Sequence, residues 1–159
     1  VKWRAKHALD TATVMGHCQA QGYDYYVHLE DDIKAAPNYP TKMREWIDEK
    51  YAARGDWTLL SFYNPWRVKD GERLKPYNFF GVIGQVFRPS DLPTIAAFLR
   101  KNFDDSPLDW LFVDLLTKFK GQIVTHTPSY FQHEGRVSSL QGKTQSSRAV
   151  DFIGDRRGM

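Results

Sequence analysis

The sequence is poor in cysteine, in long apolar stretches and in clustered positive charge, and each shortage excludes a class of protein. Cys18 is the only cysteine among 159 residues, so a framework of internal disulfides is excluded. No apolar run approaches the roughly 20 residues that a transmembrane helix needs, and no signal peptide is visible. Lysine and arginine never exceed two in a row and the net charge is only +3, which argues against a nucleic-acid partner.

Aromatic residues, by contrast, are abundant, with 5 Trp, 8 Tyr and 10 Phe. They supply a core first, and exposed rings also offer apolar faces on which sugars stack. A chain of 159 residues is long enough to bury a core as one compact domain or as part of a larger one. It opens on Val1 rather than on methionine, so we expect a piece of a longer protein.

Helical and strand-like segments alternate along the chain, which predicts an α/β fold. Apolar spacing predicts a helix at about residues 3–21, which Gly22 ends in a left-handed turn. Three more helices are expected at about 38–54, 90–103 and 106–119, with Asn38, Ser90 and Ser106 as their caps. Strands are expected at 25–29, before an acidic turn, and at 57–63, 81–87 and 122–126. We expect a long surface loop at 64–78 and irregular chain after Pro128. Residues 1–145 are assigned to the domain and 146–159 to a tail.

Three consecutive carboxylates end the first predicted strand. The alternating residues 25–29 are typical of a strand, and Glu30, Asp31 and Asp32 follow directly. Adjacent anions repel each other, and desolvating each one costs several kcal/mol unless something compensates. A divalent cation is the commonest compensation, because hard oxygen ligands suit Mg²⁺ or Mn²⁺. A solvated acidic turn after an ordinary strand is the alternative that the three residues leave open.

Residues far along the chain could complete such a site. His133 would add an imidazole to the carboxylates, a sensible shell for Mn²⁺, although a lone histidine is more often structural. Asp109 follows Ser106 at the spacing of a capping box, so it is either a structural cap or a general base. The helix dipole at that position lowers its basicity, which weighs against the base. Residues 138–143 could bind a phosphate group or simply be solvated.

Four segments occur in a fixed order: YYVHLEDDI at 25–33, GVIG at 81–84, PLDWL at 107–111 and FQHEGRVSSLQGK at 131–143. Together they resemble the N-acetylglucosaminyltransferase IV family, which adds a β1,4-linked GlcNAc branch to a core mannose of N-glycans. The resemblance covers about residues 3–143, most of the chain. The acidic triplet alone is shared by many glycosyltransferases, whereas the last segment is much more specific.

The resemblance implies an inverting glycosyltransferase with a GT-A (Rossmann-like) fold, of which this chain would hold the C-terminal two-thirds. It implies UDP-GlcNAc as donor, Mn²⁺ (or Mg²⁺) as cofactor, and a glycan or glycoprotein acceptor. Asp32 would be the direct metal ligand, His133 would complete the metal site, and Asp109 matches the general base. The residues that would contact the nucleotide sugar or the acceptor are Glu30, Asp31, Trp110, Ser138, Ser139 and Lys143.

Some features depart from the family pattern. The first part of a GT-A domain, with most of its uridine-binding strands, has no counterpart before Val1, so a missing N-terminal part of the same protein is an expected partner. Glu134 adds an acid beside the proposed metal histidine. Rival interpretations are a glycan-binding module without catalysis, a GT-A transferase that acts on a glycolipid or GPI glycan, and a metal-dependent phosphohydrolase. In a eukaryote, the family implies a Golgi lumenal domain behind an N-terminal anchor that this chain lacks.

Overall fold

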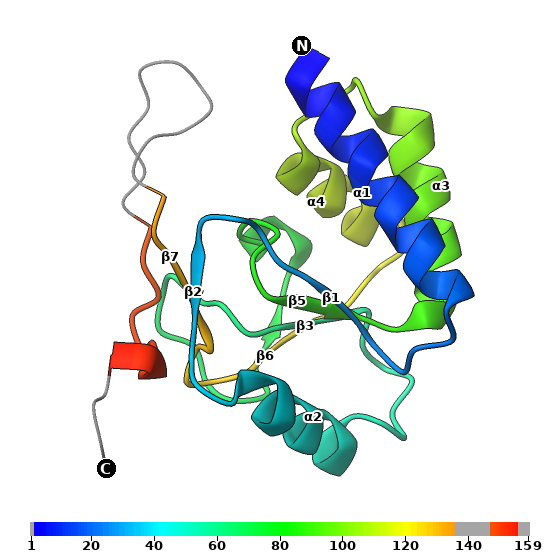
Figure 1. Cartoon of the computed structure of the whole chain (residues 1–159). Helices are drawn as coiled ribbons and strands as arrows, with labels where there is room; N and C mark the ends of the chain where they lie inside the picture. Colours follow the sequence, from blue (N-terminus) through cyan, green and yellow to red (C-terminus); the bar gives the residue numbers. More distant parts are fainter. Residues whose placement is uncertain (1, 136–146, 156–159) are drawn as a thin grey trace.

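A computed structural model describes residues 2–135 and 147–155. Helices and short strands are interspersed along this part of the chain (Figure 1). The helices are α1 Lys2–Ala20, α2 Tyr39–Lys50, α3 Leu92–Asn102 and α4 Leu108–Lys118. The strands are β1 Tyr26–His28, β2 Ile33–Ala35, β3 Leu59–Ser61, β4 Arg73–Leu74, β5 Gln85–Phe87, β6 Ile123–Thr125 and β7 Phe131–His133. The three short 3₁₀ turns are η1 Pro76–Asn78, η2 Pro89–Asp91 and η3 Ile153–Asp155.

The strands form a mixed sheet of five strands and a separate pair. The five-stranded sheet has the order β1-β5-β3-β6-β4. Within it β3 and β6 run parallel, and the other neighbours are antiparallel. β2 and β7 form the separate antiparallel pair. A mixed sheet with helices on both faces confirms the predicted α/β class.

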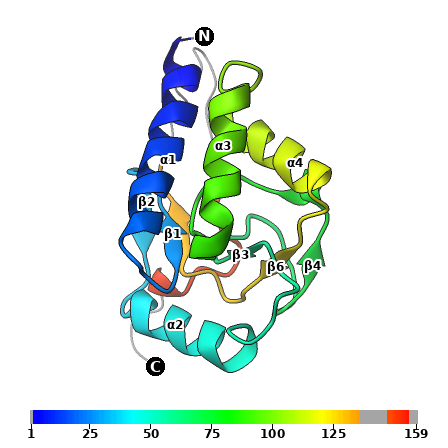
Figure 2. The same ribbon diagram turned by 90° about the vertical axis from the view of Figure 1, so that its right-hand side faces the viewer.

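Each face of the five-stranded sheet carries its own core, because successive side chains of a strand point to opposite faces. Leu59 of β3 and Phe87 of β5 join the core under α1, α3 and α4. Their neighbours Leu60 and Val86 join a second core with α2 and with Phe131 of β7. Figures 1 and 2 show α1, α3 and α4 gathered over one face and α2 beneath the other.

The helices follow their apolar spacing, but two of the three predicted N-caps, Ser90 and Ser106, are wrong. Gly22, just beyond α1, has a left-handed φ of 72°, as its position predicted. Asn38 holds the N-cap position of α2 in a left-handed conformation and makes no side-chain cap bond. Ser90 lies inside the 3₁₀ turn that precedes α3. Pro107 takes the N-cap position of α4 in place of Ser106, without a side-chain cap bond.

Two stretches predicted to be irregular contain strands. Residues 64–78 include β4, which pairs with β6 at the sheet edge, and the turn η1. Asp70 fastens this stretch to α2, since it accepts a hydrogen bond from Lys50 at 3.0 Å. The chain after Pro128 forms β7, which pairs with β2. The sequence pattern missed this pair because β2, which follows the turn at Asp31 and Asp32, and β7 are each only three residues long.

The described residues 147–155 pack against the domain. Phe152 is buried in the second core. Ser129 donates to Asp151 through both its backbone N–H, at 3.1 Å, and its hydroxyl, at 2.7 Å. The hydroxyl of Tyr63 donates to the carbonyl of Ser147 at 2.8 Å. This part of the predicted tail is therefore held by both apolar and polar contacts. Within the described residues, no helix has the length and apolar character needed to cross a lipid bilayer.

Candidate metal centre

The acidic residues lie in the short turn between β1 and β2. Tyr26 of β1 is buried in the core under α1, while Val27 packs against the second core on the other face. This anchoring fixes where the strand ends, and the next residues carry Glu30 and Asp32 out of the sheet. The β1 alternation predicted from the sequence is therefore the feature that places the carboxylates.

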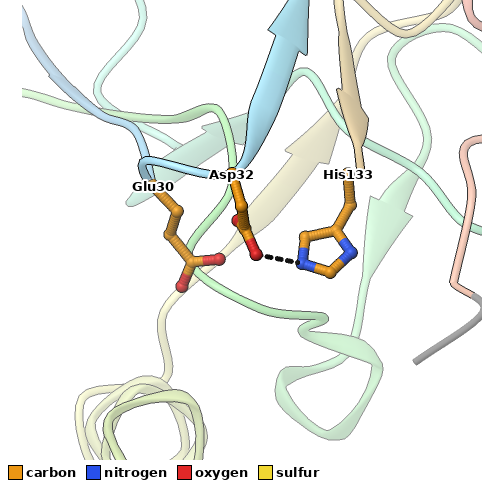
Figure 3. Close-up of side chains that lie close together, drawn as sticks. All are labelled: Glu30, Asp32 and His133. Carbon is orange, nitrogen blue, oxygen red and sulfur yellow. Dashed lines mark ion pairs between the residues drawn. The ribbon is translucent and has the colours of Figure 1, made fainter. Parts of the chain in front are cut away.

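His133 reaches the acidic turn through the pairing of β7 with β2. In this antiparallel register His133 lies opposite Ile33. The backbone N–H of Glu134 donates to the carbonyl of Asp32 at 2.9 Å and extends the pairing by one more bond. The Nε2 of His133 lies 3.1 Å from Asp32 Oδ2 (Figure 3). Strand pairing between distant segments thus brings the imidazole to the carboxylate.

Glu30 joins this pair to form a group of three potential ligands. One ligand atom from each of Glu30, Asp32 and His133 lies within 4.8 Å of the other two. Figure 3 shows the functional ends of the three side chains gathered between the acidic turn and β7. His133 is 7 % exposed, whereas the Asp32 side chain is 42 % exposed and so remains open to solvent. Two carboxylates and one imidazole, partly accessible, fit a hard divalent cation such as Mn²⁺.

The electrostatics of the group favour a cation. Burial, together with the charges of Asp32, Asp109 and Asp31, raises the pKa of Glu30 to about 7. Burial, with the charges of Glu30 and Asp32, also raises the pKa of Tyr63 to about 12. Both shifts report negative charge collected in a poorly hydrated region, which is unfavourable unless positive charge compensates. A bound cation would relieve that repulsion.

A cleft of about 820 Å³ opens beside the acidic turn. Its walls come from α1, from Tyr23 and from the continuous segment 25–32. The residues of α1 that face the cleft are His7, Asp10, Thr11, Val14 and Cys18. Burial lowers the pKa of His7, and the charges of Asp10, Asp109 and Asp31 oppose that shift. Glu30 and Asp32, the two candidate carboxylate ligands, therefore line a space large enough for a small-molecule substrate.

The structure brings most of the predicted site residues to this region. Asp109, in the first turn of α4, lies close enough for its charge to act on both Glu30 and His7. Asp31 is exposed and lines the cleft, outside the three-ligand group. Trp110 is 60 % exposed. The side chain of Glu134 is exposed, and only its backbone is bonded to the acidic turn.

Three predicted residues, Ser138, Ser139 and Lys143, lie outside the described residues, so their assignments stay predictions. The sequence analysis predicted that Glu30 contacts the nucleotide sugar or the acceptor rather than the metal ion. It also gave no role to Tyr63 or His7, which border the same charged region. Only the position of Glu30 within the acidic triplet could have suggested its place. No motif distinguishes Tyr63 or His7, because the fold alone brings them near the acids.

The fold and the site together define an α/β domain with a candidate metal centre at the edge of a cleft. The chain belongs to the family described as MGAT4 conserved region, whose model matches residues 1–152. This confirms the family that the four segments suggested.

Named relatives agree with that family. The chain is 33 % identical over 167 residues to alpha-1,3-mannosyl-glycoprotein 4-beta-N-acetylglucosaminyltransferase B of Danio rerio. The matched region covers 96 % of this chain and 27 % of that protein. The B enzyme of Homo sapiens has the same identity and coverage. The C enzyme of Macaca fascicularis is 32 % identical over 157 residues, with 96 % of this chain and 28 % of the relative covered. The chain thus spans little more than a quarter of these relatives' length.

Proposed function

We propose that this chain is part of an inverting, metal-dependent glycosyltransferase of the GT-A type. It would move GlcNAc from UDP-GlcNAc to a mannose of an N-glycan in β1,4 linkage. One observation carries the proposal: Glu30, Asp32 and His133, from segments far apart in the sequence, converge within 4.8 Å beside a cleft. Membership of the family, and relatives named as N-acetylglucosaminyltransferases, supply the reaction class.

Glu30, Asp32 and His133 are the residues that would hold a Mn²⁺ or Mg²⁺ ion. When bound, such an ion neutralises the negative charge that develops on the departing UDP. The partly exposed Asp32 carboxylate is open to solvent, from which the diphosphate would approach. The buried His133 ring contacts this carboxylate through Nε2. A nucleotide sugar would add phosphate oxygens to the three ligands that the described residues supply.

Asp109 would accept the proton of the acceptor hydroxyl as that oxygen attacks the anomeric carbon. Attack from the face opposite to UDP inverts the configuration in a single displacement. The charge of Asp109 acts on Glu30, and this proximity to the candidate metal centre supports the proposed role of Asp109 as the base. Trp110 follows Asp109 directly and is 60 % exposed, which suits stacking against a sugar. In a eukaryotic source, we place this reaction in the Golgi lumen.

The deciding experiment incubates the longest natural form with labelled UDP-sugars and a panel of N-glycans, with and without Mn²⁺. The proposal predicts a product from UDP-GlcNAc only when the metal is present, carrying a new β1,4-linked residue. Calorimetry with UDP in Mn²⁺ and in EDTA separates the alternatives. A glycan-binding module would release no metal-dependent heat. Transfer to a glycolipid alone would identify a different transferase, and either result would overturn the proposal.

A further inference from the structure

Gly135 touches the candidate metal centre although it carries no functional group. It follows β7 and lies two residues after His133, so a side chain there would share the face of His133. A Cβ atom built on Gly135 would overlap the Asp32 Oδ2 atom. The same Cβ would stand 3.0 Å from both Asp32 Cγ and His133 Cε1. Real Cβ atoms essentially never approach a heavy atom closer than this.

The obstruction falls on the contact that forms the site. Asp32 Oδ2 is the atom that lies 3.1 Å from His133 Nε2. The Asp32 backbone cannot easily yield, because its carbonyl accepts the Glu134 N–H at 2.9 Å and Ile33 is already paired with His133. An added methyl group would therefore displace the Asp32 carboxylate rather than the strands. The requirement for glycine here is spatial, since Gly135 is not among the residues with positive φ.

We propose that Gly135 is a positioning residue, whose missing side chain leaves the space in which the Asp32 carboxylate meets His133. The effect on cation affinity rests on the proposed metal centre. The effect on the position of the Asp32 carboxylate rests on the geometry without a metal. This positioning role explains why a glycine follows His133 and Glu134, since neither a turn nor a left-handed backbone requires a glycine at this position. It also makes residue 135 a determinant of cation affinity without contact to the cation.

The test compares Gly135→Ala with Gly55→Ala, a matched control, because a Cβ on Gly55 would meet nothing within 4 Å. Mn²⁺ dissociation constants are measured by calorimetry for both variants and for the wild-type chain. Changes to residues that orient metal ligands typically weaken binding about 10–100-fold. We expect a loss of that size for Gly135→Ala and none for Gly55→Ala. Equal Mn²⁺ affinity in the two variants would overturn the inference.

A metal-free readout separates this inference from the proposed function. In EDTA, the imidazole Nε2 resonance of His133, the atom that meets Asp32 Oδ2, should shift in Gly135→Ala and stay in place in Gly55→Ala, because only the former displaces the Asp32 carboxylate. If the wild-type chain binds no Mn²⁺ while the resonance still shifts, the metal centre fails and the positioning role of Gly135 stands. An unmoved resonance removes that role regardless of the metal.

A double-mutant cycle covers the case in which Gly135→Ala folds poorly. Unfolding is followed in EDTA for Gly135→Ala, for Asp32→Ala and for the double variant. If the methyl group collides with Asp32, Gly135→Ala lowers the unfolding midpoint in the wild-type background and lowers it much less in Asp32→Ala. Independent, additive effects would show that residue 135 acts on something other than Asp32.

Discussion

Gly84 supports β7, and replacing it with alanine should destabilise the fold measurably. It has a left-handed φ of 61°, and a Cβ there would lie 2.7 Å from Phe131 Cε2 and 3.1 Å from Phe131 Cγ. Phe131 is fully buried and packs edge-on against Tyr39 at a centroid distance of 4.9 Å, so its ring has no free space to enter. Gly84→Ala thus adds backbone strain and overpacking at one position.

The two contributions can be estimated and measured separately. A left-handed backbone costs a residue with a Cβ roughly 1–2 kcal/mol, and overpacking a core typically costs about 1–3 kcal/mol. Gly84→Ala should therefore lower the free energy of unfolding by about 2–5 kcal/mol, which is roughly 4–20 °C in Tm for a chain of this size. Gly22→Ala carries only the strain, because φ is 72° and a Cβ would meet nothing within 4 Å. Gly55→Ala adds neither backbone strain nor overpacking.

Urea unfolding monitored by far-ultraviolet circular dichroism, with a common m-value, should rank the three variants. We expect Gly55→Ala to match the wild type, Gly22→Ala to lose about 1–2 kcal/mol from strain alone, and Gly84→Ala to lose the most. Equal losses for Gly84→Ala and Gly22→Ala would refute the close packing of Gly84 under Phe131. They would also undermine the placement of β7, and with it that of His133.

Two further predictions concern catalysis and pH. Asp109→Ala should reduce transfer roughly 100- to 10,000-fold while UDP binding persists. Asp114→Ala, which makes the same charge change on α4, is the control. Comparable turnover by the two variants would remove Asp109 from the mechanism. Burial lowers the pKa of His126, and the charge of Lys50 acts in the same direction. The charges of Asp70 and Asp151 and the hydrogen bond to the Pro128 carbonyl oppose this shift. The contribution of His126 to stability is therefore present above about pH 6.5 and falls as pH decreases, because the unfolded chain takes up the proton first. The difference in unfolding free energy between wild type and His126→Gln should narrow from pH 7.5 to 5.5, and a constant difference would contradict this.

The sequence predicted what local patterns determine. Apolar spacing located all four helices of the described chain, and the alternation at residues 25–28 identified β1. The chemical types of Asp32, His133 and Asp109 left structural alternatives open, and the resemblance to the family assigned the three residues to one site before any contact was known. Their proximity in the fold agrees with that hypothesis, while their roles stay predictions.

Long-range pairing determined what the sequence could not show. β2 and β7 are three residues each and pair across most of the chain, so neither carries enough alternation to be recognised alone. The turn that separates β1 from β2 also moves Glu30 into the ligand group, which no spacing rule indicates. The caps predicted at Ser90 and Ser106 failed for a local reason, since a 3₁₀ turn precedes α3 and a proline holds the N-cap position of α4.

The central claim is that Glu30, Asp32 and His133 hold one cation, and direct Mn²⁺ titration tests it most simply. Calorimetry should show one site in the wild-type chain, and Asp32→Asn and His133→Gln should abolish measurable binding. Asp31→Asn, which removes the neighbouring charge but none of the three ligands, should retain most of the affinity. If all three variants bind Mn²⁺ as the wild type does, or if Asp31→Asn alone loses binding, the three residues do not form the metal centre.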